Sequence, residues 1–329
     1  MTYIVLKGTS MNIHVGVLVI EGTLPSAVLG VKDIFDICNA YCKKKDEASF
    51  TLSFVGLEDT IRLSGIEIGL KNLKEERRYA YIIVPPIITG HELVVSEALK
   101  RWLIAQYHKG AVLAAACMGS FVLAHTGLLD FKRATTHWLL EEKFKENFPK
   151  VVLQSEKILI DEGALITAGG VTAYIDLALY LIEKSLSLKT ANKCASLLLV
   201  DRGREYQTCY KDLSSMILVK DKGIKKLLIW MKNNLDKELE IKTLAKRMNM
   251  GERSFMRYFK KEVNMTPIQY LQGLRIEEAK ALLVNSKDSF EQITYGVGFT
   301  NESSFRRLFK RETSLNPGEY RKKFKSHHL

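Results

Sequence analysis

The chain has 329 residues, of which 47% are hydrophobic and 26% are charged, and its formal net charge is +12. This length is enough for two or three domains with substantial cores. The charge is uneven: residues 216–329 hold 24 Lys and Arg against 13 Asp and Glu, so the first 215 residues are nearly neutral. A neutral body joined to a basic tail is typical of a nucleic-acid-binding protein, although a solvated basic face without a partner has the same composition.

The composition also argues against several classes of protein. There are five cysteines: Cys38, Cys42, Cys117, Cys194 and Cys209. Their spacing fits neither a metal site nor a disulfide framework, and the N-terminus shows no basic segment followed by a long apolar run, so we expect no metal and no secretory signal. Residues 110–129 carry no charge, but Gly119, Ser120 and His125 interrupt this membrane-span length. We therefore predict a reduced, cytoplasmic protein without a membrane partner.

In chain order, the first two hundred residues alternate apolar strands with amphipathic helices. Strand-length apolar runs lie at 13–20, 50–55, 81–84 and 111–116. Helical patterns lie between and after them, at 27–42, 91–107 and 119–126, and extended excursions are predicted at 62–69 and 157–167. Strands that alternate with crossover helices favour a mainly parallel sheet with helices on both faces.

The fourth predicted strand leads into a segment that contains a candidate reactive cysteine. Residues 114–120 read Ala-Ala-Ala-Cys-Met-Gly-Ser, which is the strand, turn and helix layout of a nucleophile elbow at Cys117. A helix dipole there would lower the pKa of the Cys117 thiol and make it reactive, and an exposed thiolate is also a candidate redox sensor. The alternative is a tight turn that needs a small residue and has no reactivity.

After residue 200 only helical patterns remain. The polar stretch at 206–219 is predicted as a linker, and a helix capped by Asp221 follows, with its apolar residues on one stripe. Beyond it, the segment SFMRYFKKE at 254–262 recurs 50 residues later as SFRRLFKRE at 304–312. Each copy follows a short helix and a glycine-containing turn, which predicts two helix-turn-helix units.

The second helix of each unit has two distinct faces. Phenylalanines four residues apart are predicted to face inward: Phe255 with Phe259, and Phe305 with Phe309. The outward faces suit a DNA major groove, where arginine pairs with guanine; they present Arg253, Met256 and Arg257 in the first copy and Glu302, Ser303, Arg306 and Arg307 in the second. Cations near the helix ends suit phosphates: Lys260, Lys261, Lys310 and Arg311. The alternative is a pair of helical hairpins that pack together or bind an acidic protein.

The tail from about residue 220 to 324 resembles the DNA-binding domain of the AraC family, in which a long helix joins two helix-turn-helix units. The joining helix would begin at Pro267 and contains LRIEEAKALL at 274–283, whereas Thr294 stands where the family usually has alanine. The resemblance implies that one protomer reads two major-groove segments about one helical turn apart.

The first part of the chain resembles the PfpI-type branch of the class I glutamine amidotransferase-like superfamily, in its GlxA-like form fused to an AraC-type domain. The matching segments lie at 117–138 and 167–183. This resemblance implies an α/β flavodoxin-like three-layer sandwich. We therefore predict a sensor and dimerisation domain at 1–205, a linker at 206–219 and an all-α tandem helix-turn-helix domain at 220–329.

Departures from the superfamily's enzymes predict that this domain is not an enzyme and needs no cofactor. Met118 stands where PfpI-type hydrolases have histidine, and the turn at 24–30 lacks the carboxylate that relatives with an active thiol use, since Glu21 belongs to the strand end. The rival hypothesis is a thiol hydrolase or hydratase with a DNA-binding appendage.

We expect an effector pocket by the carboxyl ends of the strands, around the elbow. Its expected lining is Ala27, Gly30, Cys117, Met118, His137 and Gly170. Some relatives respond to small nitrogenous metabolites, which is the class of effector expected. The sequence thus predicts a homodimeric transcription regulator that binds double-stranded promoter DNA at an operator and acts on RNA polymerase under effector control.

Overall fold

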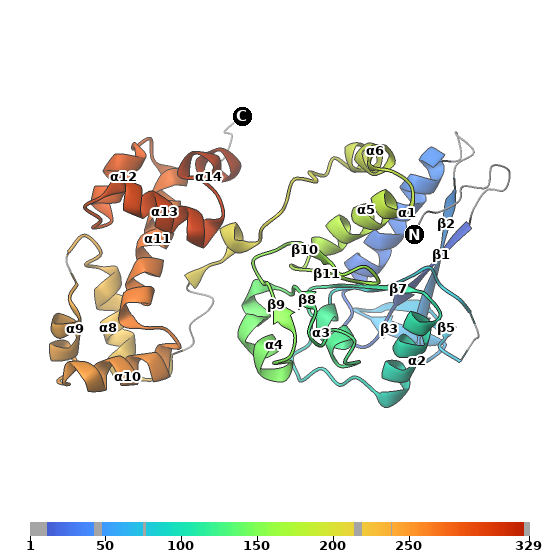
Figure 1. The fold of residues 1–329 in the computed structure, drawn as a ribbon, viewed down its shortest axis with the longest axis horizontal. Coiled ribbons are helices and arrows are strands. Elements are labelled where there is room, and N and C mark those ends of the chain that lie inside the picture. The colour runs from blue at the N-terminus through green and yellow to red at the C-terminus, as the bar shows by residue number, and fades with distance from the viewer. Residues whose placement is uncertain (1–11, 43–47, 75–76, 214–218, 238, 326–329) are drawn as a thin grey trace. The chain divides into compact units, whose positions relative to one another are not determined.

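The chain folds into two compact units, which meet in sequence after Gln207 (Figure 1). The computed structural model describes residues 12–42, 48–74, 77–213, 219–237 and 239–325. The boundary between the units falls inside the segment predicted as a linker, of which residues 214–218 lie outside the described part. Within the described ranges, no helix is both long and apolar enough to span a membrane.

The first unit is built on a seven-stranded sheet with the order β10-β11-β7-β6-β1-β2-β5. Its strands are β1 (Asn12–Leu18), β2 (Ser49–Gly56), β5 (Lys71–Asn72), β6 (Tyr81–Val84), β7 (Val112–Ala116), β10 (Leu159–Asp161) and β11 (Leu165–Ala168). All neighbours are parallel except β10 and β11. Two small sheets pair β3 (Thr60–Leu63) with β4 (Ile66–Gly69) and β8 (Arg133–Ala134) with β9 (Val152–Leu153). The predicted parallel sheet is confirmed.

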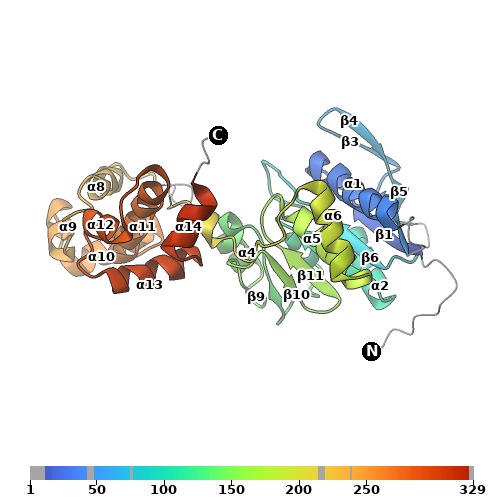
Figure 2. The same ribbon diagram turned by 90° about the horizontal axis from the view of Figure 1, so that it is seen from above.

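Helices cover both faces of this sheet (Figures 1 and 2). One core lies under α1 (Pro25–Cys42), α5 (Ala173–Ser185) and α6 (Leu188–Leu198). The other lies under α2 (Glu97–His108), α3 (Gly119–Ala124) and α4 (Glu141–Asn147), which follows the 3-10 helix η2 (Trp138–Leu140). Helix α2 begins later than the sequence pattern predicts, because the Ser96 side chain caps it by accepting from the Leu99 amide at 3.3 Å. The predicted α/β three-layer sandwich is confirmed.

The second unit is entirely helical. Its elements are the 3-10 helix η3 (Thr208–Tyr210) and the α-helices α8 (Lys222–Lys232), α9 (Ile241–Arg247), α10 (Glu252–Val263), α11 (Pro267–Asn285), α12 (Phe290–Gly296), α13 (Glu302–Thr313) and α14 (Pro317–Phe324). One core surrounds Phe255 and Phe259, and a second surrounds Phe305 and Phe309. Helix α11 contributes side chains to both cores, so it joins two small helical bundles, as predicted.

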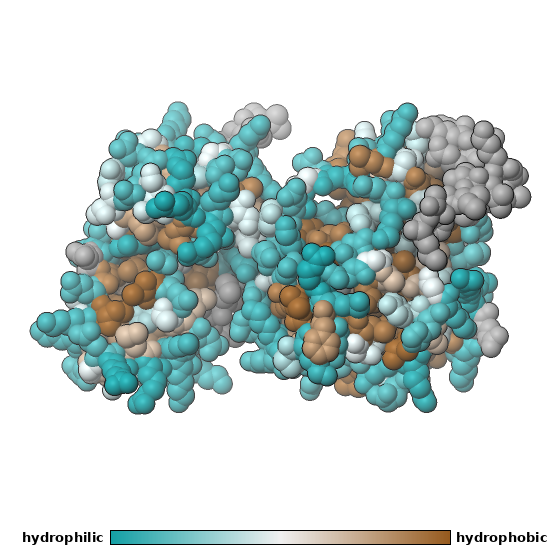
Figure 3. All heavy atoms as spheres, in the orientation of Figure 1, coloured by the Kyte–Doolittle hydropathy of each residue, from teal (hydrophilic) through white to brown (hydrophobic). Residues whose placement is uncertain are grey.

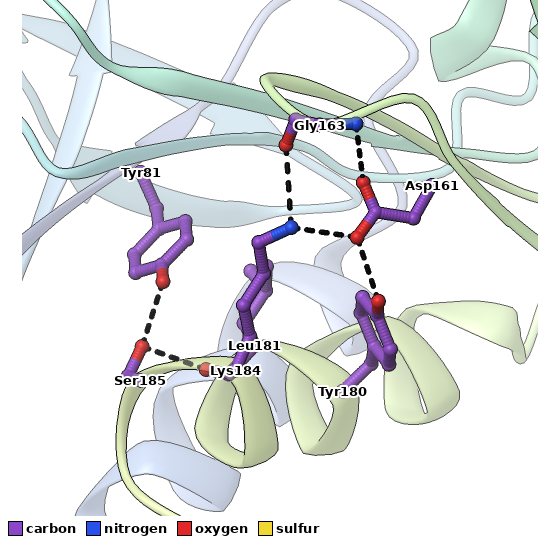
Figure 4. A network of polar contacts seen from close by, with 7 residues as sticks. All are labelled: Tyr81, Asp161, Gly163, Tyr180, Leu181, Lys184 and Ser185. Atoms are coloured by element: carbon purple, nitrogen blue, oxygen red, sulfur yellow. Dashed lines mark hydrogen bonds and ion pairs between the residues drawn. The ribbon is translucent and has the colours of Figure 1, made fainter. Parts of the chain in front are cut away.

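A polar network fastens α5 to the hairpin of β10 and β11 in the first unit (Figure 4). The Asp161 carboxylate accepts from the Lys184 ammonium at 2.6 Å, the Tyr180 hydroxyl at 2.6 Å and the Gly163 amide at 2.7 Å. Burial alone would raise the pKa of Asp161, but these hydrogen bonds outweigh it and hold the pKa below its ordinary value of 3.8. The ionised carboxylate therefore stabilises the folded unit.

We expect Asp161→Asn to lower the free energy of unfolding by about 1–2 kcal/mol at neutral pH, because an amide cannot pair with the Lys184 ammonium. The folded-state pKa of Asp161 is lowered, so the carboxylate's contribution is present above pH 3.8 and disappears as pH falls through the folded-state pKa. Urea unfolding at neutral and acidic pH measures the difference. The exposed Glu58→Gln substitution is the control, and an Asp161→Asn deficit that does not shrink in acid would contradict the assignment.

Candidate functional sites

The two helix-turn-helix units repeat one another in structure as well as in sequence. Helices α10 and α13 each have 12 residues, and each ends at a residue with a left-handed backbone, Asn264 (φ 57°) and Ser314 (φ 58°). A left-handed residue also lies in the turn before each of these helices: Asn249 (φ 53°) before α10 and Gly298 (φ 83°) before α13. The structure therefore presents two equivalent helices on one long connecting helix.

The side chains predicted to face outward on α10 do so. Arg253, Met256 and Arg257 are exposed, whereas Phe255 and Phe259 are fully buried. Neither arginine forms an ion pair with any residue that the structure describes. In Figure 3 the lower edge of this unit, where α10 lies, is largely hydrophilic. Both guanidinium groups are free to meet an external acceptor.

On the outward face of α13, the arginines contact neighbouring side chains. Arg306 forms an ion pair with the half-buried Glu302 and lies 4.8 Å from the Phe290 ring centre, and Arg307 donates to the Ser304 hydroxyl at 3.3 Å. An exposed ion pair of this kind contributes only about 0.3–0.5 kcal/mol, so a guanine can displace it. The remaining predicted residues are also exposed: Ser303, Lys260, Lys261, Lys310 and Arg311.

Within the helical unit, Arg275 on α11 connects the two helix-turn-helix bundles. It donates to the carbonyl oxygens of Leu235 at 3.2 Å and Lys237 at 3.0 Å, which lie between α8 and α9, and its guanidinium lies 5.1 Å from the ring centre of Phe299 in the second turn. A Cβ on Gly298 would lie 2.2 Å from the Leu235 carbonyl oxygen, so only glycine allows this approach. From the sequence, Arg275 was recognisable only as part of a family pattern.

The elbow predicted at Cys117 is present in the first unit. Cys117 follows β7 with φ 55°, a backbone conformation that side chains rarely adopt. Its amide donates to the Ala168 carbonyl at 2.7 Å, and its carbonyl accepts from the hydroxyls of Ser120 at 2.8 Å and Thr136 at 2.9 Å. A Cβ on Gly119 would lie 2.7 Å from the backbone oxygens of Val84, which ends β6, and Pro85, so the glycine allows α3 to pack on the sheet.

The Cys117 thiol is the opposite of an activated nucleophile. It is 4% exposed, and burial raises its pKa to about 11, against a smaller lowering by a hydrogen bond with the Met118 backbone. The expectation of a lowered thiol pKa at Cys117 is therefore wrong, because burial raises the pKa by more than the Met118 backbone lowers it. Helix α3, which follows the elbow, has only six residues.

The groups that sequence reasoning placed near this thiol have other roles. The Nδ1 atom of His137 accepts from the Leu139 amide at 3.1 Å and so caps η2, and burial lowers the pKa of His137 and keeps it neutral. The Glu21 side chain is 87% exposed and lies 3.8 Å from His91. Among the residues that the structure describes, the Met118 backbone is the one group besides burial that shifts the Cys117 pKa, and it opposes burial.

The residues predicted to line the effector pocket differ in their burial. Ala27 and Cys117 are buried, and the others are half-buried: Gly30, Met118, His137 and Gly170. A Cβ on Gly30 would lie 2.8 Å from the Tyr174 hydroxyl, so this glycine makes room for a ring that the sequence did not indicate. The effector pocket stays a prediction. No group of three metal-ligating side chains occurs within the described ranges.

Fold and sites together define a class: a two-domain protein with an elbow-bearing α/β sandwich and a tandem helix-turn-helix unit. Residues 61–184 match the DJ-1/PfpI family, and residues 244–323 match a helix-turn-helix domain family. The chain thus carries a segment similar to the DJ-1/PfpI family, followed by a segment similar to a helix-turn-helix domain.

Two proteins that are similar to this chain are described as HTH-type transcriptional regulators. The chain is 30% identical over 220 residues to the HTH-type transcriptional regulator CdhR of Pseudomonas aeruginosa, a match that covers 66% of this chain and 65% of the relative. It is 29% identical over 208 residues to the HTH-type transcriptional regulator ArgR of the same organism, covering 63% of each. The match thus spans slightly less than two thirds of these relatives. A crystal structure from Vibrio parahaemolyticus shares the fold, with a TM-score of 0.52 and 21% identity, covering 57% of this chain and 99% of that one.

We expect Gly298→Ala to destabilise the second unit by about 2 kcal/mol or more, because the new Cβ meets the Leu235 carbonyl and the backbone is left-handed. Gly296→Ala is the matched control, since its Cβ would have no neighbour within 4 Å and alanine favours the helix. Thermal unfolding of both variants measures the difference. Equal stability of the two would contradict the proposed junction.

We expect alkylation of Cys117 by iodoacetamide to be slow at neutral pH and to accelerate continuously toward a pKa of about 11, because only the thiolate reacts. Peptide mass spectrometry after timed labelling at several pH values follows this residue alone. A rate that levels off near neutral pH would show an activated thiol.

Proposed function

We propose that this protein is a sequence-specific DNA-binding transcription regulator, controlled by a small-molecule effector at a non-catalytic DJ-1/PfpI-type domain. The observation that carries the proposal is the pair of equivalent helices α10 and α13, which display exposed arginines from two similar bundles joined by α11. Arginine that is free to form two parallel hydrogen bonds suits guanine in the major groove. The basic second half supplies the phosphate attraction that such binding requires.

In the proposed complex each helix has a separate task. Arg253, Met256 and Arg257 read bases from α10, and Arg306 and Arg307 read them from α13. The cations at the helix ends, Lys260, Lys261, Lys310 and Arg311, hold phosphates and set the register without reading sequence. Because α11 and Arg275 fix the two helices together, one protomer addresses two groove segments of one duplex. A homodimer in the cytoplasm, acting on RNA polymerase, completes the proposal.

A thiol hydrolase is the rival function, and the left-handed elbow at Cys117 favours it. Against it stand the raised pKa of the buried thiol and the capping role of His137. An enzyme of this kind needs a thiolate and a base that orients it. We therefore propose that the domain binds an effector, of the class of small nitrogenous metabolites, and does not turn it over.

We expect Arg257→Ala and Arg307→Ala each to weaken specific DNA binding by about 1–3 kcal/mol and to relax the preference at one base pair. The wild-type chain selects its preferred duplexes from a random-sequence pool, and titrations with these duplexes compare the variants. Lys225→Ala, which removes an exposed positive charge from α8, is the control for a purely electrostatic loss. Sequence preference that survives in both arginine variants would refute the assigned faces.

A further inference from the structure

Gln207, the last residue of the first unit, is buried and fully engaged. It is 2% exposed, its Nε2 donates to the carbonyls of Thr136 at 2.7 Å and Lys157 at 3.1 Å, and its Oε1 accepts from the Trp138 amide at 3.0 Å. A Cβ on Gly169 would lie 2.1 Å from the same Nε2 atom, so residue 169 must be glycine for this side chain to fit. The first unit therefore contains a site shaped around the Gln207 amide.

Thr208, the next residue, is anchored in the second unit. Its hydroxyl donates to the Ser314 hydroxyl at 2.7 Å, and Ser314 is the left-handed residue that ends α13. Cys209 follows, is 3% exposed and belongs to the core that contains Phe305 and Phe309 of α13. No free residue separates the two anchors, because one peptide bond joins Gln207 to Thr208.

The anchor of Gln207 also reaches the elbow. The Thr136 carbonyl accepts from Gln207, and the Thr136 hydroxyl donates to the Cys117 carbonyl at 2.9 Å. Two residues of the predicted effector pocket, His137 and Gly170, are direct sequence neighbours of Thr136 and Gly169. A continuous series of polar contacts within each unit, linked by a single peptide bond, thus runs from the elbow to the end of α13.

We propose that Gln207 is a positioning residue that couples the state of the elbow to the hydrogen bond of Thr208 with Ser314 at the end of α13. This inference rests on the proposed function, in which α13 is a DNA-reading helix. A buried amide whose partners move must follow them or lose its hydrogen bonds, and an unsatisfied buried amide is strongly disfavoured. A displacement of Thr136 by a bound molecule is therefore passed to Thr208 and Ser314. Coupling of this kind is reciprocal, so DNA on α13 must change the elbow.

Reciprocity allows a test that needs no knowledge of the effector. The full-length protein is labelled with iodoacetamide with and without a duplex that the wild-type chain has selected, and peptide mass spectrometry follows Cys117. Because this thiol is 4% exposed, its labelling rate reports local opening of the elbow. We expect DNA to change that rate by about fivefold or more. The rate at Cys194, which is fully buried elsewhere in the same unit, serves as the internal reference.

Three variants separate coupling from stability. Gln207→Ala and Thr208→Val are expected to bring the ratio of labelling rates with and without DNA to about one. Gln106→Ala is the matched control: Gln106 is also 2% exposed and donates to a backbone carbonyl, that of Arg77 at 2.9 Å, but it is outside the series. It should keep the wild-type ratio. Thr208→Val, which removes one hydroxyl, decides the matter if Gln207→Ala does not fold.

Two results would overturn the coupling. One is a wild-type ratio of one in the presence of a duplex that binds, and the other is a ratio that survives in both Gln207→Ala and Thr208→Val. If the wild-type chain selects no duplex at all, the proposed function fails, and hydrogen exchange then tests the coupling alone. In that case α13 amides should exchange faster in Gln207→Ala than in Gln106→Ala, and equal rates would refute it.

Discussion

The contacts of Arg275 with the backbone of the first bundle are the constraint on which the helical unit depends. A protein that reads two groove segments with one chain must hold its two reading helices at a fixed separation, because an error in either position loses base contacts. Arg275 holds the two bundles together by donating to two carbonyls and by a ring contact with Phe299. Gly298 lets the second turn approach Leu235 closely enough for those contacts. In the proposed complex, the spacing of the exposed arginines depends on this half-buried junction.

In the first unit, burial determines the protonation state of the thiol at the elbow. Its elbow has the left-handed backbone that presents a nucleophile, yet the Cys117 thiol has a pKa of about 11 because it is desolvated. The hydrogen bond with the Met118 backbone lowers this pKa by less than burial raises it. The same burial is compatible with a binding role, since a neutral, closed site can still open around a ligand.

Sequence reasoning succeeded where the signal is local or periodic. Alternating strands and helices predicted the covered parallel sheet, and a 50-residue repeat predicted the paired bundles, because hydrophobic spacing fixes which face of an element is buried. It failed where distant residues meet. The pKa of Cys117 depends on burial from all sides, and the roles of Gln207 and Tyr174 depend on Gly169 and Gly30, far away along the chain. No local pattern marks such pairs.

Each of the two units contains a residue other than glycine with a left-handed backbone, and in each case that residue accepts a hydrogen bond. At the elbow the carbonyl of Cys117 accepts hydrogen bonds from the hydroxyls of Ser120 and Thr136. At the end of α13 the left-handed Ser314 presents a hydroxyl to Thr208. A left-handed backbone at a residue other than glycine is costly, and it persists where surrounding contacts hold it in place. The left-handed elbow at Cys117 thus has a structural role that does not depend on an activated thiol.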